Sequence, residues 1–220
     1  MTRVLILGAT GWVGQQLLDQ ALEHDQVSSV IAPTRKALSA HPKLNNPIVN
    51  YEQLPEQASW WACDVVLCAL GSTLKQAGSR AAFYRVDHDY VLMAAKLAKA
   101  NGCHCLVLNS SLGAKPDAGS FYLRVKGETE GDLIKLGLRS LTLVRPSLLD
   151  GDKRPEQRHA EAMSIALGKL LGPLIPKKFR PISTAKVARA MLNAGLVEVN
   201  HVTSDSTRAN TIIIESDALH

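Results

Sequence analysis

The sequence lacks any hydrophobic run long enough to cross a bilayer. A membrane-spanning helix needs about 20 consecutive apolar residues, and no stretch of this chain of 220 residues reaches that length. The apolar start, MTRVLILGATG, is short and leads into glycines, so it predicts a strand and not a signal sequence. We therefore expect a cytoplasmic protein that does not associate with membranes.

Cysteine is scarce as well. The four residues are Cys63, Cys68, Cys103 and Cys105, and no two of them form a CxxC pair. A structural metal site needs about four ligands at suitable spacing, which this set does not provide. Each cysteine lies in or beside an apolar run. They therefore predict buried free thiols in a reducing compartment, with no metal site.

Positive charge is mild and scattered. The formal net charge is +5 and the pI is about 9.1, but Lys and Arg form no dense stripe of the kind that binds nucleic acid. The excess belongs either to an ordinary solvated surface or to a surface that attracts a phosphorylated ligand. Nucleic acid is therefore not an expected partner.

What the chain does contain is an alternation of short, β-branched apolar runs and amphipathic segments. This order predicts an α/β protein, a doubly wound parallel sheet with the Rossmann fold and helices on both faces. The length suits one domain over 1–220, in which 146–220 would form a small C-terminal lobe on the substrate side. Strands are expected at 3–7, 27–32, 64–69, 104–109, 140–144 and 211–215, with a short one at 48–51. Helices are expected at 12–23, 83–101, 122–136, 161–171 and 183–196.

A GxxGxxG motif at residues 8–14 directly follows the first strand and opens the first helix. In a dinucleotide site, Gly8 permits a tight turn, Gly11 lets the backbone approach a pyrophosphate, and Gly14 lets the helix pack on the strand. Backbone N–H groups at the helix N-terminus then face the anion. The alternative is an ordinary turn with chance glycines. The expected cofactor contacts here are Gly8, Thr10, Gly11, Trp12, Val13 and Gly14.

The end of the second strand indicates which dinucleotide binds. An NAD site usually has an acidic residue there for the ribose hydroxyls, but this stretch reads Ala-Pro-Thr-Arg-Lys over 32–36. Arg35 could stack on adenine and contact a 2′-phosphate with its planar guanidinium. The alternative is that Arg35 and Lys36 are solvated loop charges. We expect NADP(H) in preference to NAD(H).

A second constellation is the YxxxK pair, Tyr122 and Lys126, on a predicted helix. Residues four apart lie on the same helix face, and a neighbouring cation stabilises a phenolate, which ordinarily forms near pH 10. Ser110 and Ser111 lie upstream at the end of a strand, where parallel sheets bind ligands. A serine hydroxyl there could hold a substrate carbonyl. YxxxK alone often arises by chance. The prediction therefore depends on its position downstream of the glycine motif and the strand-end serines.

These motifs together resemble the short-chain dehydrogenase/reductase superfamily, with the glycine spacing of its extended and atypical branches. The sequence is most similar to the Tat-interacting-protein family of NADPH-binding, oxidoreductase-like proteins. The segments that carry this resemblance are ALGST at 69–73, RVDHDYVL at 85–92, NSSLGAKPDAGSFYLRVKGETE at 109–130, LVRPSLL at 143–149 and RAMLN at 189–193.

The resemblance implies roles for individual residues. Tyr122 would be the acid–base residue, Lys126 would bond the nicotinamide ribose, and Ser111 or its neighbour Ser110 would orient the carbonyl. Members of the superfamily's main branch carry an asparagine on the central helix to complete a proton relay, and this chain has Val86, Asp87 and His88 in that region. Further cofactor contacts implied by the resemblance are Ala69, Leu70, Gly71 and Pro146.

Asp87, His88 and Asp89 also form a consecutive cluster that could suggest a metal site. Consecutive residues of a helix point in different directions, so they are not expected to converge on one ion. We expect solvated or capping roles for them.

The sequence therefore predicts an NADP(H)-dependent oxidoreductase that transfers hydride on a carbonyl/alcohol substrate. The alternative is an NADP(H)-binding regulatory or redox-sensing protein with little or no catalysis. The identity of the small-molecule substrate is left open. A protein partner is also left open, as is the choice between a monomer and a homodimer.

Overall fold

The centre of the molecule is a parallel sheet of seven strands in the order β3-β2-β1-β4-β5-β6-β9. The computed structural model describes residues 1–150, 176–202 and 209–220. The predicted Rossmann-type α/β fold is confirmed. The strands are β1 (Thr2–Leu7), β2 (Val27–Ile31), β3 (Leu44–Asn45), β4 (Val65–Cys68), β5 (Cys105–Asn109), β6 (Ser140–Arg145) and β9 (Asn210–Glu215).

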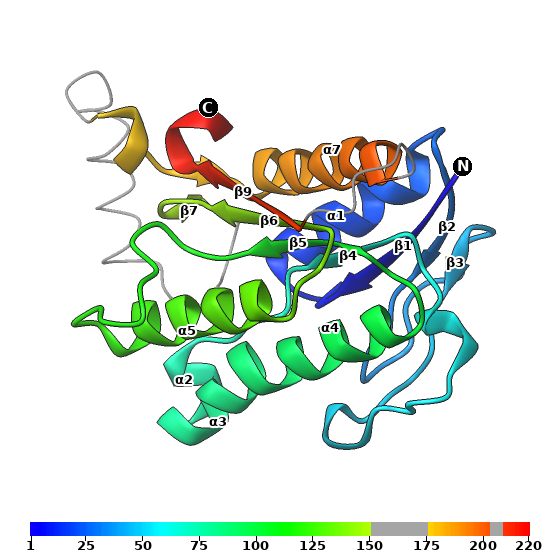
Figure 1. Cartoon of the computed structure of the whole chain (residues 1–220), viewed down its shortest axis with the longest axis horizontal. Helices are drawn as coiled ribbons and strands as arrows, with labels where there is room; N and C mark the ends of the chain where they lie inside the picture. Colours follow the sequence, from blue (N-terminus) through cyan, green and yellow to red (C-terminus); the bar gives the residue numbers. More distant parts are fainter. Residues whose placement is uncertain (151–175, 203–208) are drawn as a thin grey trace.

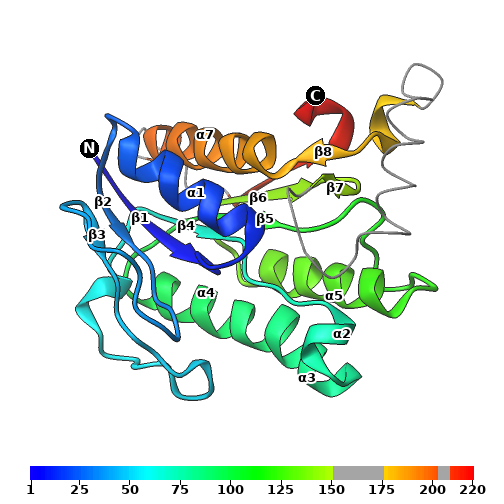
Figure 2. The same ribbon diagram turned by 180° about the vertical axis from the view of Figure 1, so that it is seen from behind.

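Helices cover both faces of the sheet. Figure 1 shows α1 and α7 on one face and α4 and α5 on the other, and the view from behind in Figure 2 agrees. Central strands such as β4 are therefore buried on both sides, which explains their unbroken apolar sequence. The main helices are α1 (Trp12–Glu23), α2 (Leu74–Ala77), α3 (Arg80–Tyr84), α4 (Tyr90–Ala100), α5 (Phe121–Lys135) and α7 (Thr184–Val202).

Helix α7 packs unusually close to the sheet. A Cβ on Gly195 would lie 2.8 Å from Cδ2 of Leu67 and 3.1 Å from Cγ2 of Val65. We expected this helix to end at the glycine, and that prediction was wrong, because α7 continues to Val202. The glycine permits close packing of helix on sheet and does not terminate the helix.

The C-terminal part of the chain contributes to the main layers. Helix α7 lies beside α1, and β9 pairs in parallel with β6 at the edge of the sheet. Two short strands, β7 (Leu149–Asp150) and β8 (Ile182–Ser183), form a separate small sheet. The helix expected at 161–171 lies outside the described residues. A substrate-side lobe within 146–220 therefore stays a prediction.

Two regions differ from the expected elements. The strand expected at 48–51 is reduced to a single bridge between Ile48 and Thr34, because the preceding Pro47 has no N–H with which to extend the ladder. A 3-10 turn follows at Tyr51–Gln53. The helix expected at 83–101 begins earlier, at Arg80, and a π-helical turn at Arg85–Asp89 interrupts it before α4.

Candidate functional site

The glycine turn between β1 and α1 has no room for a side chain at Gly8 or Gly14. Gly8 has a φ of 82°, and a Cβ there would lie 2.7 Å from the backbone of Ala69. A Cβ on Gly14 would lie 1.9 Å from the carbonyl oxygen of Gly8. Gly11 caps α1 without a side-chain hydrogen bond, and the first turn of the helix has no acidic residue. A helix N-terminus that has no side-chain cap and no acidic residue in its first turn suits the pyrophosphate of a dinucleotide.

The segment 69–71 connects this turn to the YxxxK helix. Its first residue, Ala69, contacts Gly8. At the other end, a Cβ on Gly71 would lie 3.0 Å from Oδ1 of Asp87 and 3.4 Å from Nζ of Lys126. The 69–71 segment thus lies between two groups expected from separate motifs, the glycine turn and Lys126.

Lys126 is buried in an ion pair. Its Nζ lies 2.8 Å from Oδ1 of Asp87, and the two side chains are 7% and 0% exposed. The backbone N–H of Ser72 donates to Oδ2 of Asp87 at 2.8 Å. Burial alone would lower the pKa of Lys126, but the Asp87 carboxylate and the nearby Tyr122 phenol more than offset this and raise it above its ordinary value. The ammonium therefore stays charged around neutral pH.

The π-helical turn explains how Asp87 reaches Lys126. Asp87 and His88 are consecutive, yet both are buried against α5. His88 places Nδ1 2.8 Å from Oδ1 of Asp89 and Nε2 3.1 Å from Oδ2 of Asp132 on α5. The wider turn rotates neighbouring side chains away from α-helical spacing, and such turns occur often at functional sites. The prediction of solvated or capping roles was therefore wrong for Asp87 and His88, while Asp89 is exposed.

The two candidate serines differ in what they bind. The Ser110 hydroxyl is buried and donates to Oε1 of Glu130 at 2.5 Å. Glu130 also accepts two hydrogen bonds from Arg145, at 3.0 and 2.5 Å. The Ser111 hydroxyl is partly exposed, and its recorded contact is a long one of 3.5 Å to the carbonyl of Leu112. Ser110 is therefore occupied by a structural network, whereas Ser111 remains accessible to a ligand.

Backbone bonds beyond the ends of β5 and β6 place the serines beside Pro146. Ser110 N donates to Val144 O at 2.7 Å, and Leu112 N donates to Pro146 O at 2.9 Å. The following loop then folds back onto α5, because a Cβ on Gly127 would lie 2.2 Å from the backbone of Lys115. The loop that leads from the serines to Tyr122 is thus fixed against α5.

At the other end of the site, Tyr51 holds the backbone that precedes Arg35. Its ring is buried, and its hydroxyl donates to the carbonyl of Pro33 at 3.0 Å. Burial raises the pKa of Tyr51, and the nearby Cys68 thiol adds to this; the Arg35 charge and the backbone of Gly8 act in the opposite direction. Arg35 itself is exposed. Sequence reasoning missed Tyr51, because it follows an irregular segment that matches no motif.

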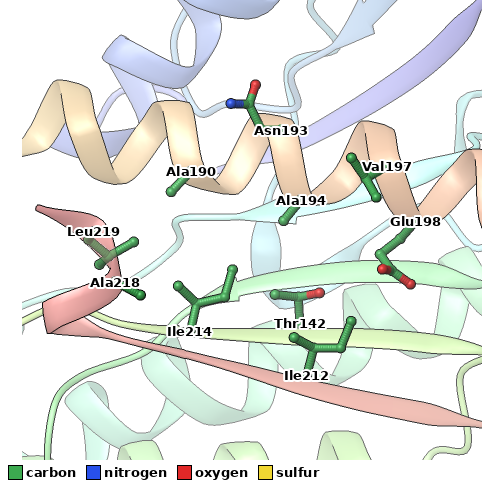
Figure 3. A pocket seen from close by; sticks show the side chains of 10 residues that line it. All are labelled: Thr142, Ala190, Asn193, Ala194, Val197, Glu198, Ile212, Ile214, Ala218 and Leu219. Carbon is green, nitrogen blue, oxygen red and sulfur yellow. The ribbon is translucent and has the colours of Figure 1, made fainter.

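A groove of about 330 Å³ lies on a different part of the molecule. Figure 3 shows it between α7 and two strands of the sheet, β6 and the edge strand β9. Its walls are mostly aliphatic, and Glu198, one of its few polar side chains, accepts a hydrogen bond from Ser140 at 2.7 Å. The predicted site residues do not line this groove, so it is separate from the candidate dinucleotide site.

Within 1–150, 176–202 and 209–220, no three His, Cys, Asp or Glu side chains are grouped so that they could hold a metal ion. Across the same residues, no helix is both long and apolar enough to cross a membrane.

Comparison with known proteins identifies the family. Residues 8–196 match a family described as NAD(P)H-binding. The chain is 38% identical over 198 residues to Protein HTATIP2 of Rattus norvegicus, covering 86% of this chain and 79% of that protein. It is 30% identical over 225 residues to "Protein FMP52, mitochondrial" of Candida albicans, covering 97% of this chain and 95% of that protein. The predicted resemblance to the Tat-interacting-protein family is confirmed.

Solved structures agree on the fold. The oxidoreductase ylbE from Lactococcus lactis has a TM-score of 0.65 at 17% identity, covering 99% of this chain and 94% of that one. A UDP-N-acetylglucosamine 4-epimerase from Methanobrevibacter ruminantium has a TM-score of 0.69 at 15% identity, covering 97% and 76%. From the glycine turn, the Rossmann sheet and these comparisons, we conclude that the chain belongs to the NAD(P)H-binding family, with HTATIP2 and FMP52 among its relatives.

Proposed function

We propose that the chain is an NADP(H)-dependent oxidoreductase that interconverts a carbonyl compound and its alcohol. One observation carries this proposal: the buried, charged Lys126 lies between the segment that contacts the glycine turn and Tyr122, one helical turn away. A protein that only bound a dinucleotide would not need a charged lysine buried beside a phenol. An ammonium in this place is suited to hold a ribose hydroxyl and to stabilise a phenolate.

The bound dinucleotide would supply or accept hydride at the substrate carbon. Tyr122 would donate a proton to the carbonyl oxygen in reduction and remove it in oxidation. The charge of Lys126 would favour the phenolate that Tyr122 becomes after it has donated. The Ser111 hydroxyl would donate to the same oxygen and orient it. In this scheme Ser110 supports Glu130 and does not touch the substrate.

NADP(H) is proposed over NAD(H) because Arg35 and Lys36 follow β2 where an acidic residue would hold the ribose hydroxyls of NAD. Both side chains are exposed. A guanidinium can make paired hydrogen bonds to a phosphate, so Arg35 is the residue proposed to contact the 2′-phosphate.

The test has two stages. Calorimetric titration with NADPH and NADH establishes whether the cofactor binds and which one is preferred. A panel of aldehydes, ketones and quinones, scored by NADPH consumption, then identifies a substrate. Tyr122→Phe should abolish most turnover on that substrate while NADPH affinity changes little, since the phenol hydroxyl acts only in proton transfer. Unchanged turnover would refute the role of Tyr122.

A second candidate function is a cofactor-binding regulatory protein with little catalysis. The Lys126–Asp87 pair favours it, because the carboxylate offsets the positive charge that Tyr122 would use. The absence of turnover on the whole panel, together with partner capture that depends on NADPH, would support this candidate.

The cytoplasmic location stays a prediction, since the FMP52 relatives are mitochondrial by name. Protein partners and oligomeric state also stay predictions.

A further inference from the structure

We propose that Asn46 is a positioning residue that fixes the turn carrying Arg35 and Lys36, and thereby sets the preference for a 2′-phosphorylated cofactor. The inference rests on the proposed function, since it concerns the same cofactor site. Asn46 follows β3 and belongs to no motif in the sequence. It would act through the backbone of the turn and would not itself contact the cofactor.

The Asn46 side chain uses both ends of its amide to hold the turn. Its Oδ1 accepts from the backbone N–H of Leu38 at 2.8 Å. Its Nδ2 donates to the carbonyl of Ala32 at 2.5 Å and to Oγ1 of Thr34 at 2.8 Å. A backbone N–H on one side and a carbonyl on the other fix the orientation of the amide. One side chain thus ties together both ends of the segment 32–38.

Thr34 extends these hydrogen bonds of Asn46 into the turn itself; we call the two side chains together the Asn46–Thr34 clamp. Its hydroxyl accepts from Asn46 and donates to the carbonyl of Lys36 at 2.6 Å. Its backbone N–H donates to Pro47 O at 3.0 Å, and its carbonyl accepts from Val49 N at 2.9 Å. The backbone on either side of Arg35 is therefore held by hydrogen bonds.

The turn therefore has a buried segment held by hydrogen bonds, followed by exposed residues. Residues 31–34 are buried, whereas Arg35, Lys36 and Ala37 are exposed. A flexible loop would have to be ordered when Arg35 closes on a phosphate, and that ordering costs binding free energy. A loop that is already fixed avoids the cost, but only for a ligand that carries the phosphate. Asn46 should therefore influence affinity for NADPH and have little influence on affinity for NADH.

The test compares the wild-type chain with Asn46→Ala by calorimetric titration with NADPH and NADH. The matched control is Asn45→Ala. Asn45 is the neighbouring residue of the same type, its side chain is exposed, and the described part of the chain offers that side chain no hydrogen bond. We expect Asn46→Ala to raise the Kd for NADPH about tenfold and to change the Kd for NADH by less than about twofold. Asn45→Ala should change neither value.

Two further measurements locate the effect. Titration with 2′,5′-ADP and 5′-AMP should reproduce the difference, since these fragments differ only in the 2′-phosphate and have no nicotinamide. In an Arg35→Ala background, Asn46→Ala should cause no further loss of NADPH affinity, because the two residues act through one contact. Thr34→Val removes a hydroxyl from the same clamp and should repeat the selective loss. If Asn46→Ala fails to fold, the titrations of Thr34→Val with NADPH and NADH test the proposal in its place.

The outcomes separate the two proposals. If wild type prefers NADPH but Asn46→Ala weakens both cofactors equally, or neither, the inference is overturned and the proposed function stands. The same conclusion follows if the losses of NADPH binding free energy caused by Arg35→Ala and Asn46→Ala are additive in the double variant. If wild type binds NADH as tightly as NADPH, the cofactor preference itself is refuted, and the role of Asn46 with it.

Discussion

Asp87 and Lys126 form an ion pair from which solvent is almost wholly excluded, with 2.8 Å between Oδ1 and Nζ. The two residues come from different helical segments, so the pair fixes the π-helical turn to α5. Asp87 also receives the backbone N–H of Ser72, directly beyond the segment that contacts the glycine turn. One carboxylate therefore connects the end of the 69–71 segment to the proposed catalytic lysine.

Removing the charge of Asp87 should destabilise the protein strongly. Asp87→Asn leaves the buried ammonium of Lys126 without a counter-ion, and the loss of one partner of a buried pair costs about 3–5 kcal/mol. Chemical denaturation measures the change in the free energy of unfolding. The double variant Asp87→Asn/Lys126→Met should recover part of the loss, because the unpaired charge is gone. A single variant as stable as wild type would show that the pair is not held as described.

The raised pKa of Lys126 also sets the direction of a pH effect. A base with a folded pKa above its unfolded value contributes stability that is fully present below the unfolded pKa and lost as pH rises through the folded value. This contribution should therefore be constant near neutrality and disappear only in strong alkali.

Substitution of the two neighbouring serines should affect different properties, kcat for Ser111 and stability for Ser110. Ser111→Ala should lower kcat by about a hundredfold or more, because a donor to the developing oxyanion is lost. Ser110→Ala should change kcat only slightly but lower stability by about 1–3 kcal/mol, since Oε1 of the buried Glu130 carboxylate loses one of its two donors and keeps only Arg145. Steady-state kinetics and denaturation on both variants check this. The reverse pattern would assign the catalytic role to Ser110.

Two glycines of α5 provide a matched pair. Gly131 has open space around it, so Gly131→Ala should stabilise the helix by up to about 1 kcal/mol. A Cβ on Gly127 would lie 2.2 Å from the backbone of Lys115, so Gly127→Ala should displace the loop after the serines. We expect it to lower both melting temperature and kcat. Similar melting temperatures for the two variants would contradict the close contact.

His104 should make the protein less stable as the solution is acidified. Burial lowers its pKa, and the positive charges of Arg139 and Lys99 add to this. The unfolded chain therefore takes up the proton first, so stability falls as pH drops from about 6.5 towards the folded pKa. His104→Asn should show a shallower loss between pH 7 and pH 5. An identical pH profile for the variant would exclude this contribution.

The sequence allowed the sheet and its main helices to be predicted because buried parallel strands and amphipathic helices leave strong periodic signals. Helix α1 was predicted with the bounds that the structure shows. The order of β9 beside β6 was not predicted, since pairing between distant strands leaves no local pattern. The end of α7 was mistaken because Gly195 is required by the neighbouring Leu67 side chain, which lies far away in the sequence.

The candidate site was predictable only where a motif marks it. The glycines, Tyr122 and Lys126 belong to recognisable spacings. Asp87 was misjudged because a π-helical turn changes the direction of its side chain, and the sequence was interpreted with α-helical spacing. Asn46 and Tyr51 act through hydrogen bonds to the backbone of another segment, and such bonds require the fold to be known.

The pairing of β9 with β6 has a consequence for synthesis of the chain. Arg145 and Glu215 are partners at the end of this pair, and they are 70 residues apart in sequence. At about 5–20 residues per second, a ribosome needs several seconds to cover that distance. During this interval the apolar edge of β6 has no neighbour, and unpaired edges promote aggregation. The edge of β6 can therefore be closed only after β9 has been synthesised, and until then it stays open to pairing with other chains.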